Sequence, residues 1–192
     1  QRSLVNMSSI KLTADSGGGT FELKAPSSSG NTRVLTVPDT ANGTVLTTTN
    51  PKAGNILGVS YGFRTGHLQT TSTSYVDSGI TANITPASSS NKVLIQMNIL
   101  MGINDASAQD QQVQVKILRD STEIFTERTA DYMRYAVGGG EIDYLIAGQF
   151  LQNLDSPSTT NQITYKLQVK RTGSGTTSVW AGSNICLMEV SA

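Results

Sequence analysis

Four short apolar units, separated by turn-forming residues, recur along the first quarter of the chain. Each unit has the alternating pattern of a strand with one buried face. The units are Ile10–Leu12, Phe21–Leu23, Val34–Val37 and Thr44–Leu46. A segment this small carries too few apolar side chains to close a core by itself. We therefore expect a thread of short strands that pairs with other copies of the chain in an intertwined, oligomeric shaft.

The composition has few charges and many small polar residues. Only 15% of the 192 residues are charged, and 14 basic residues balance 14 acidic ones. Thr favours half-exposed strands, whereas Ser, Gly and Asn favour turns, so the composition predicts an all-β protein. A neutral chain without a basic stripe is not expected to bind nucleic acid. No run approaches the roughly 20 apolar residues of a membrane-spanning helix, so membrane insertion is not expected either.

Residues 47–54 are rich in Thr, Asn, Pro and Gly, which marks a linker. We expect residues 1–50 to form the shaft and oligomerisation segment and residues 55–192 to form a separate domain. In that domain, alternating apolar runs predict roughly eight or nine strands, as in a jelly-roll-like β-sandwich. The main predicted strands are Ile56–Val59, Ile80–Thr85, Lys92–Gly102, Val113–Ile117, Glu123–Arg128, Glu141–Leu151, Ile163–Val169 and Ile185–Val190.

Three local features sharpen this prediction. Lys92–Gly102 carries apolar residues on both faces, which indicates a central strand covered on both sides. Gly173–Gly175 is predicted to be a hairpin tip, and Asp120–Ser121 is predicted to be another. Cys186 is the only cysteine, so it can form no intramolecular disulfide, and we expect it to fill the core of the last strand.

Several motifs in this order resemble virion appendage proteins of tailed bacteriophages, especially the tail-fibre and similar trimeric fibre proteins of aquatic phages. They are Phe21–Pro26, Gly43–Thr48, Gly54–Leu57, Ser72–Asp77, Ile84–Ile95, Leu118–Ser121, Leu154–Thr160, Thr164–Leu167 and Leu187–Val190. The resemblance implies a homotrimer on the virion surface, made in the host cytoplasm, with no enzyme activity and no cofactor. The chain departs from the pattern at Gly58–Gly62, where similar proteins often have a polar β-branched run.

A hydrolase motif is present at Gly58–Gly62, which matches the nucleophile elbow around Ser60. The elbow requires a following helix and a late histidine base, yet no helix is indicated and the sole histidine, His67, lies seven residues on. We expect a glycine-bounded loop or strand edge instead. His67 lacks an acidic neighbour in sequence and is a poor metal ligand.

Acidic residues offer two further alternatives. Glu141 and Asp143 share one face of a predicted strand, near the spacing of a retaining glycosidase pair. A second acidic group contains Glu123, Glu127 and Asp131, and a third, with oxygen ligands for calcium, contains Asn104, Asp105 and Asp110. Neighbouring arginines make ion pairs an equal explanation for the first two groups, and the third lacks the spacing of a calcium motif. We therefore predict no catalytic, cofactor-binding or metal-binding residues.

A candidate receptor contact lies at Tyr132, Arg134 and Tyr135, where two tyrosines flank an arginine shortly before three glycines. Aromatic faces beside a polar group suit sugar or protein recognition. The alternative is a strand whose tyrosines cover the core. Trp180 offers the same choice between sugar stacking and core packing, and core packing is favoured.

These observations predict a non-enzymatic structural protein of a phage particle, namely a trimeric tail-fibre or receptor-binding protein whose sandwich attaches to the host surface. Its expected partners are further copies of itself, other virion proteins that contact the N-terminal segment, and a host-surface glycan or protein. A capsid-decorating or head-fibre protein is the first alternative. A small glycan hydrolase is the remote one.

Overall fold

The computed structural model describes residues 9–13, 16–24, 30, 52–105, 111–126, 133–135, 142–173 and 175–192. Every regular element among them is a β-strand, which confirms the predicted all-β class. Contacts between residues divide the chain into two units, 1–45 and 46–192. The sequence places its linker slightly later, at residues 47–54.

The first unit contains two strands, β1 (Ser9–Thr13) and β2 (Thr20–Lys24), which correspond to the first two predicted apolar units. They pair with each other in antiparallel register, from Ser9 opposite Lys24 to Thr13 opposite Thr20. Two members of the expected thread thus pair within one copy. The other two units, 34–37 and 44–46, lie outside the described residues, and intertwining between copies stays a prediction.

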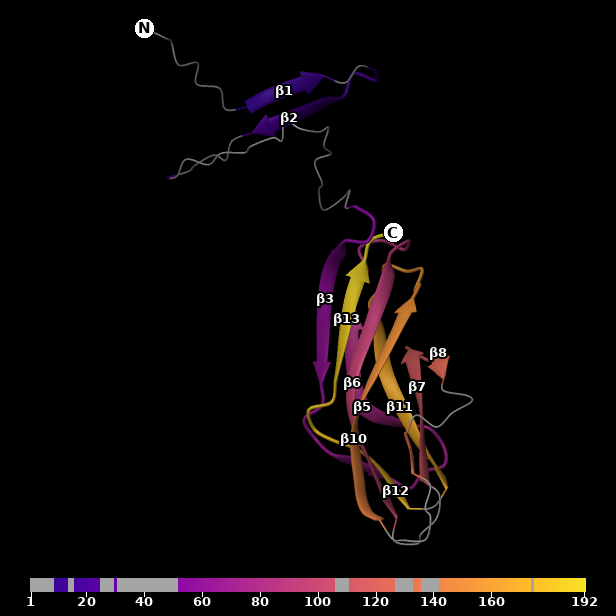
Figure 1. Ribbon diagram of the computed structural model, residues 1–192. Helices are drawn as coiled ribbons and strands as arrows, with labels where there is room; N and C mark the ends of the chain where they lie inside the picture. Colours follow the sequence, from indigo (N-terminus) through magenta and orange to yellow (C-terminus); the bar gives the residue numbers. More distant parts are fainter. Residues whose placement is uncertain are drawn as a thin grey trace. The chain divides into compact units, whose positions relative to one another are not determined.

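The second unit is a β-sandwich of two antiparallel sheets, as the sequence predicts (Figure 1). Its described residues form eleven strands, more than the predicted eight or nine. The six-stranded sheet contains β3 (Ile56–Phe63), β4 (Leu68–Thr70), β6 (Lys92–Asp105), β10 (Ile142–Asp155), β12 (Thr176–Val179) and β13 (Asn184–Val190). The five-stranded sheet contains β5 (Val76–Ile84), β7 (Gln111–Arg119), β8 (Thr122–Thr126), β9 (Met133–Tyr135) and β11 (Ile163–Gly173).

Strand β6 is the centre of the six-stranded sheet. One of its edges pairs with β10 along nearly its whole length, and the other pairs first with β13 and then with β12. Strand β3 lies outside β13, so β3, β13, β6 and β10 form a surface four strands wide (Figure 1). In the other sheet, β11 lies between β5 and β7, and β7 forms the predicted hairpin with β8.

The core fills the space between the two sheets. Alternate residues of β6, from Val93 to Ile103, are buried there and meet the alternate apolar residues of β7 and β11. Tyr165 of β11 is the largest side chain that is fully buried. The inner side of the six-stranded sheet is therefore covered by the five-stranded sheet.

The glycine-rich turn at residues 173–175 does not form the predicted hairpin. Strand β11 before it belongs to the five-stranded sheet, whereas β12 after it pairs with β4 and β6 in the other sheet. Gly173 and Gly175 both have positive φ angles, 100° and 80°, which glycine adopts without steric cost. The turn thus carries the chain from one layer to the other.

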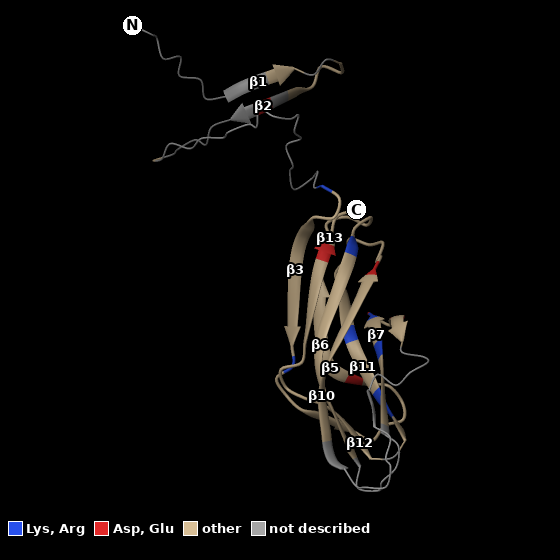
Figure 2. Cartoon of the chain, viewed as in Figure 1, with Lys and Arg blue, Asp and Glu red and all other residues tan. Residues whose placement is uncertain are grey.

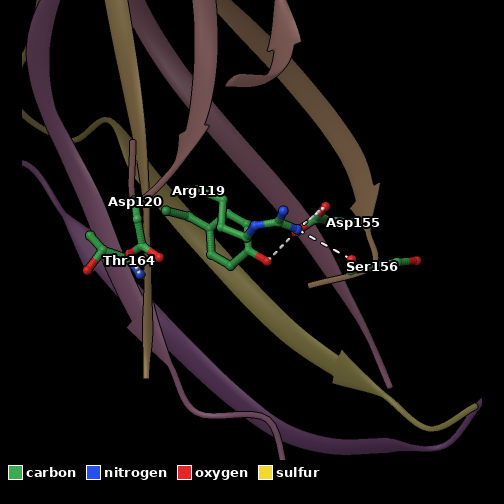
Figure 3. Close-up of polar contacts among 6 residues, drawn as sticks. Arg119, Asp120, Asp155, Ser156 and Thr164 are labelled. Atoms are coloured by element: carbon green, nitrogen blue, oxygen red, sulfur yellow. Dashed lines mark hydrogen bonds and ion pairs between the residues drawn. The ribbon is translucent and has the colours of Figure 1, made fainter. Parts of the chain in front are cut away.

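A polar cluster joins the two sheets at one end of the sandwich (Figure 3). Arg119 at the end of β7 donates from Nη1 to both carboxylate oxygens of Asp155 at the end of β10, at 3.0 and 2.8 Å. The buried Tyr165 hydroxyl donates to the same carboxylate at 2.6 Å. Beside them, Asp120 accepts a hydrogen bond from the Thr164 amide. Such charge-assisted bonds fix the position of β10 over β7 and β11.

Burial raises the pKa of Tyr165 far above its usual value of 10.0, and the bond to Asp155 raises it further. Because the folded state disfavours the phenolate, this contribution to stability is complete below pH 10 and is lost as the pH rises beyond it. We expect Tyr165→Phe to lower stability at pH 7 by about 1.5–3 kcal/mol through the lost bond to a charged group. Above pH 10, the unfolding free energy of this variant should then fall less steeply with increasing pH than the unfolding free energy of the wild type. Urea titrations across that range measure both effects, and equal slopes would contradict the assignment.

Gly62 is required by a close approach of the two sheets. A Cβ atom there would overlap the backbone carbonyl of Thr81 in β5, and it would also crowd Ile185. We expect Gly62→Ala to destabilise the protein by about 1–3 kcal/mol, the usual range for overpacking. The matched control is Gly148→Ala in β10, where an added Cβ meets nothing within 4 Å. Chemical unfolding that shows equal stabilities for the two variants would contradict this account.

Candidate assembly interface

The side of the six-stranded sheet that points away from the core is largely apolar. We call this surface the outer face, and it is formed by alternate residues of β3, β13, β6 and β10. Strand register places these residues in rows that cross the sheet. The rows are Val59–Met188–Leu94–Leu154, Tyr61–Cys186–Gln96–Gln152 and Phe63–Asn184–Asn98–Phe150, and Leu100–Gly148 and Gly102–Ile146 continue them across β6 and β10.

The large apolar residues of the outer face are exposed. Val59, Tyr61 and Phe63 on β3 are 64%, 60% and 55% exposed, and Phe150 on β10 is 57% exposed. Scattered exposed apolar residues are normal on soluble proteins, but here they share one face of one sheet, and the apolar row Val59–Met188–Leu94–Leu154 joins its two borders. A contiguous apolar patch of this kind marks an interaction site.

The outer face carries no charged side chain in any of its rows. The charges of these four strands lie near the strand ends (Figure 2), as with Lys92, which begins β6, and Asp155, which ends β10. Glu189 is buried and accepts hydrogen bonds from Asn91 and the Ala87 amide. The polar members of the rows are amides, and Asn98 and Asn184 are bonded to each other. An interface core typically has this composition, with charges confined to the rim.

A hollow of about 280 Å³ interrupts the outer face. Its lining includes Leu100 of β6, Gly148 and Phe150 of β10, and Gly182 of the turn before β13. A Cβ atom added at either glycine would meet nothing within 4 Å. Glycine at these two positions therefore leaves the space open. At the opposite border of the sheet, Val59, Tyr61 and Phe63 of β3 are each more than half exposed.

Two sequence predictions fail on this surface. Strand β6 was expected to be covered on both sides, but Leu100 is 37% exposed and Leu94 is only partly buried. Cys186 was expected in the core, but it lies part-buried on the outer face, because β13 directs Ile185 and Leu187 inward instead. The alternating set of β10 that includes Ile146 and Phe150 likewise points outward, and Leu145, Ala147 and Leu151 pack toward the core.

The predicted receptor-contact residues are only partly described. Tyr132 lies outside the described residues, whereas Arg134 and Tyr135 belong to strand β9. They pair with Gln112 and Gln111 at the start of β7. The start of β7 pairs with the end of β11 at Gly173, so β9 lies at the end of the sandwich opposite the C-terminus and the entry of the chain at Gly54.

The hydrolase motif is an ordinary piece of strand. Ser60 lies in the middle of β3, opposite Leu187 of β13, with strand residues on both sides. His67 follows in the loop before β4, and its ring stacks on the part-buried Trp180 at 4.0 Å between centroids. Trp180 thus packs against a surface histidine rather than in the core.

The acidic candidates do not assemble into a site among the described residues. Glu141, Glu127, Asp131 and Asp110 lie outside them, and only the backbone is described for Asp143 and Asp105. Glu123 forms a 3.9 Å ion pair with Lys116 across β7 and β8. In the described part of the chain, no cluster of three His, Cys, Asp or Glu residues is placed to hold a metal ion. Nor do these residues include a helix of the length and hydropathy needed to cross a membrane.

The outer-face residues, above all Tyr61, Phe63 and Phe150, were not predicted as functional. One signal was available in the sequence, namely the second apolar set of Lys92–Gly102 together with Cys186, Met188 and Val190 of the last strand. Both strands then carry apolar residues on each face, and only one face can point into a two-layer core.

No protein-family model and no curated protein matches the sequence. Similar solved structures include that of the infectious bursal disease virus Gt strain, with a TM-score of 0.40 and 11% identity over 91% of this chain and 45% of that chain. The VP2 subviral particle of the same virus matches with a TM-score of 0.37 and 12% identity, over 90% of this chain and 47% of that chain. The T13 particle matches with a TM-score of 0.40 and 11% identity, over 91% of this chain and 42% of that chain. This chain thus spans less than half the length of those chains. TM-scores below 0.5 do not establish a common fold, so the sandwich is described from its own strands.

Proposed function

We propose that this chain is a non-catalytic structural protein of a virus particle and that it works as an oligomer. The outer face is the observation that carries the oligomeric part of this proposal. A sandwich with a complete core gains nothing within its own copy from a second, uncharged apolar surface, whereas an assembling subunit uses such a surface. The virion location is supported by the motifs that resemble phage appendage proteins.

The finer form of the proposal is a trimeric tail-fibre or receptor-binding protein of a tailed phage. Strand β9 supports it, since Arg134 and Tyr135 lie at the end of the sandwich opposite the entry of the chain. In a fibre held by its N-terminal segment, that end is available to a host-surface glycan or protein. Capsid decoration is the alternative, because a stable oligomer with a polar rim suits a head surface equally well.

Antibodies raised against the purified full chain test the location. Applied with a gold label to virions that carry this gene, they should mark the tail if the fibre proposal is right. Label on the head would replace it with capsid decoration. Virions that contain the protein in neither place would overturn the virion proposal as a whole.

Alanine replacement of the candidate receptor residues tests the attachment role. We expect the Tyr132→Ala, Arg134→Ala, Tyr135→Ala variant to bind host cells at least about tenfold more weakly, since aromatic and arginine anchors dominate such contacts. Flow cytometry with fluorescent protein measures the binding, and sedimentation confirms an unchanged oligomer. Asn83→Ala, on the exposed side of β5, is the control. Equal binding by both variants would exclude these residues as the contact.

A further inference from the structure

We propose that a second copy of this chain covers the outer face, and that the β3 ridge of one copy packs into the hollow beside Gly148 of the next. The ridge consists of Val59, Tyr61 and Phe63. This inference rests on the proposed oligomeric function and specifies its contact surface. It is independent of the location on the particle.

The chemistry of the outer face favours an identical partner. A partner with charged residues at its centre would bury them opposite apolar side chains, at a cost of several kcal/mol for each unpaired ion. A second copy brings no such charge. The amides of Gln96, Asn98, Gln152 and Asn184 also suit one another, because each amide carries both a donor and an acceptor. Identical amide surfaces can therefore satisfy each other when they meet.

The shape of the outer face is complementary to itself. The ridge lies on β3 at one border of the surface, and the hollow lies between β6 and β10 at the other. A cavity of about 150 Å³ accommodates a benzene ring, and the hollow of about 280 Å³ exceeds that volume. Ridge and hollow are different parts of one surface, so each copy can offer both to its neighbours. Arranged about the three-fold axis of the proposed trimer, the ridge of each copy meets the hollow of the next and the ring closes.

The size of the surface sets the scale of this contact. Four strands about 4.8 Å apart cover the roughly 14 Å from Phe150 to Leu154, and β6 and β10 continue for roughly another 14 Å to Ile146, which together gives a projected area of about 400 Å². The relief of the side chains adds to this, and a standard interface buries about 800 Å² on each partner. Strand β10 also pairs only with β6 among the described strands. Its other edge borders the outer face and extends the surface that a neighbour can cover.

Charged substitutions in the ridge and in the hollow test the contact. Phe63→Glu changes the ridge, and Gly148→Arg changes the hollow at a position where an added Cβ meets nothing within 4 Å. Each should weaken association on the order of 100-fold or more, as expected for a buried unpaired charge. Asn83→Arg places the same new charge on the exposed side of the other sheet and should associate like the wild type. Analytical ultracentrifugation at micromolar concentration measures this, and circular dichroism verifies folding.

The double variant Phe63→Glu, Gly148→Arg tests the pairing of ridge and hollow. Within one copy these positions lie on opposite borders of the surface, three strand spacings across and two residues along, or about 16 Å apart. Between copies they meet, so the new charges should attract each other and restore at least about tenfold of the lost affinity. If the double variant loses affinity by the product of the two single-variant losses, the proposed pairing of ridge and hollow is wrong.

Cys186 provides a native thiol probe of the contact, because it is the only cysteine and lies part-buried on the outer face. In the associated wild type its thiol should react with a disulfide reagent at least about tenfold more slowly than in Gly148→Arg. Equal rates in a wild-type oligomer would place the contact elsewhere. A wild type that sediments as a monomer would instead refute the proposed oligomeric function. If the wild type is an oligomer that Phe63→Glu and Gly148→Arg leave intact, only the present inference fails.

Discussion

A sheet in a two-layer sandwich can turn only one of its faces to the core, and this sheet has two apolar faces. The inner face of β6 is covered by the five-stranded sheet, with Val93 through Ile103 buried in alternation. No described segment of the same unit covers the other face, where Leu100 and the neighbouring Phe150 remain exposed. Full burial of one large apolar side chain is worth about 1.5–3 kcal/mol. Much of that free energy is still available to a partner.

The exposed face is not the remnant of an incomplete core. The interior between the sheets is continuous, and its polar end is closed by the Arg119–Asp155–Tyr165 cluster. The backbone of β3 approaches β5 so closely that only glycine fits at position 62. A sandwich so well determined on its inner side has no structural need for Tyr61 or Phe63 on its surface. In the proposed oligomer, those side chains pack against a second copy.

Much of the strand layout was predictable because period-two alternation depends only on neighbouring residues. The β7–β8 hairpin followed from alternation at 113–117 and the turn at Asp120, which has a positive φ of 52°. The turn at 173–175 was recognised, but its role was not. A glycine turn looks the same in sequence whether the next strand pairs with the last one or crosses to the opposite sheet. Only the long-range pairing of Thr176–Val179 with β6 distinguishes them.

The sequence by itself determined the all-β class, the positions of the long strands and a surface poor in charge, since these depend on local pattern and composition. It could not determine which apolar side of β6, β10 and β13 faces inward. Alternation reveals that a strand has two different sides. When both sides are apolar, however, the sequence does not indicate which of them faces the core. That choice was made by the packing of β7 and β11 against one side. The same packing left Cys186 and Phe150 on the other side and created the outer face.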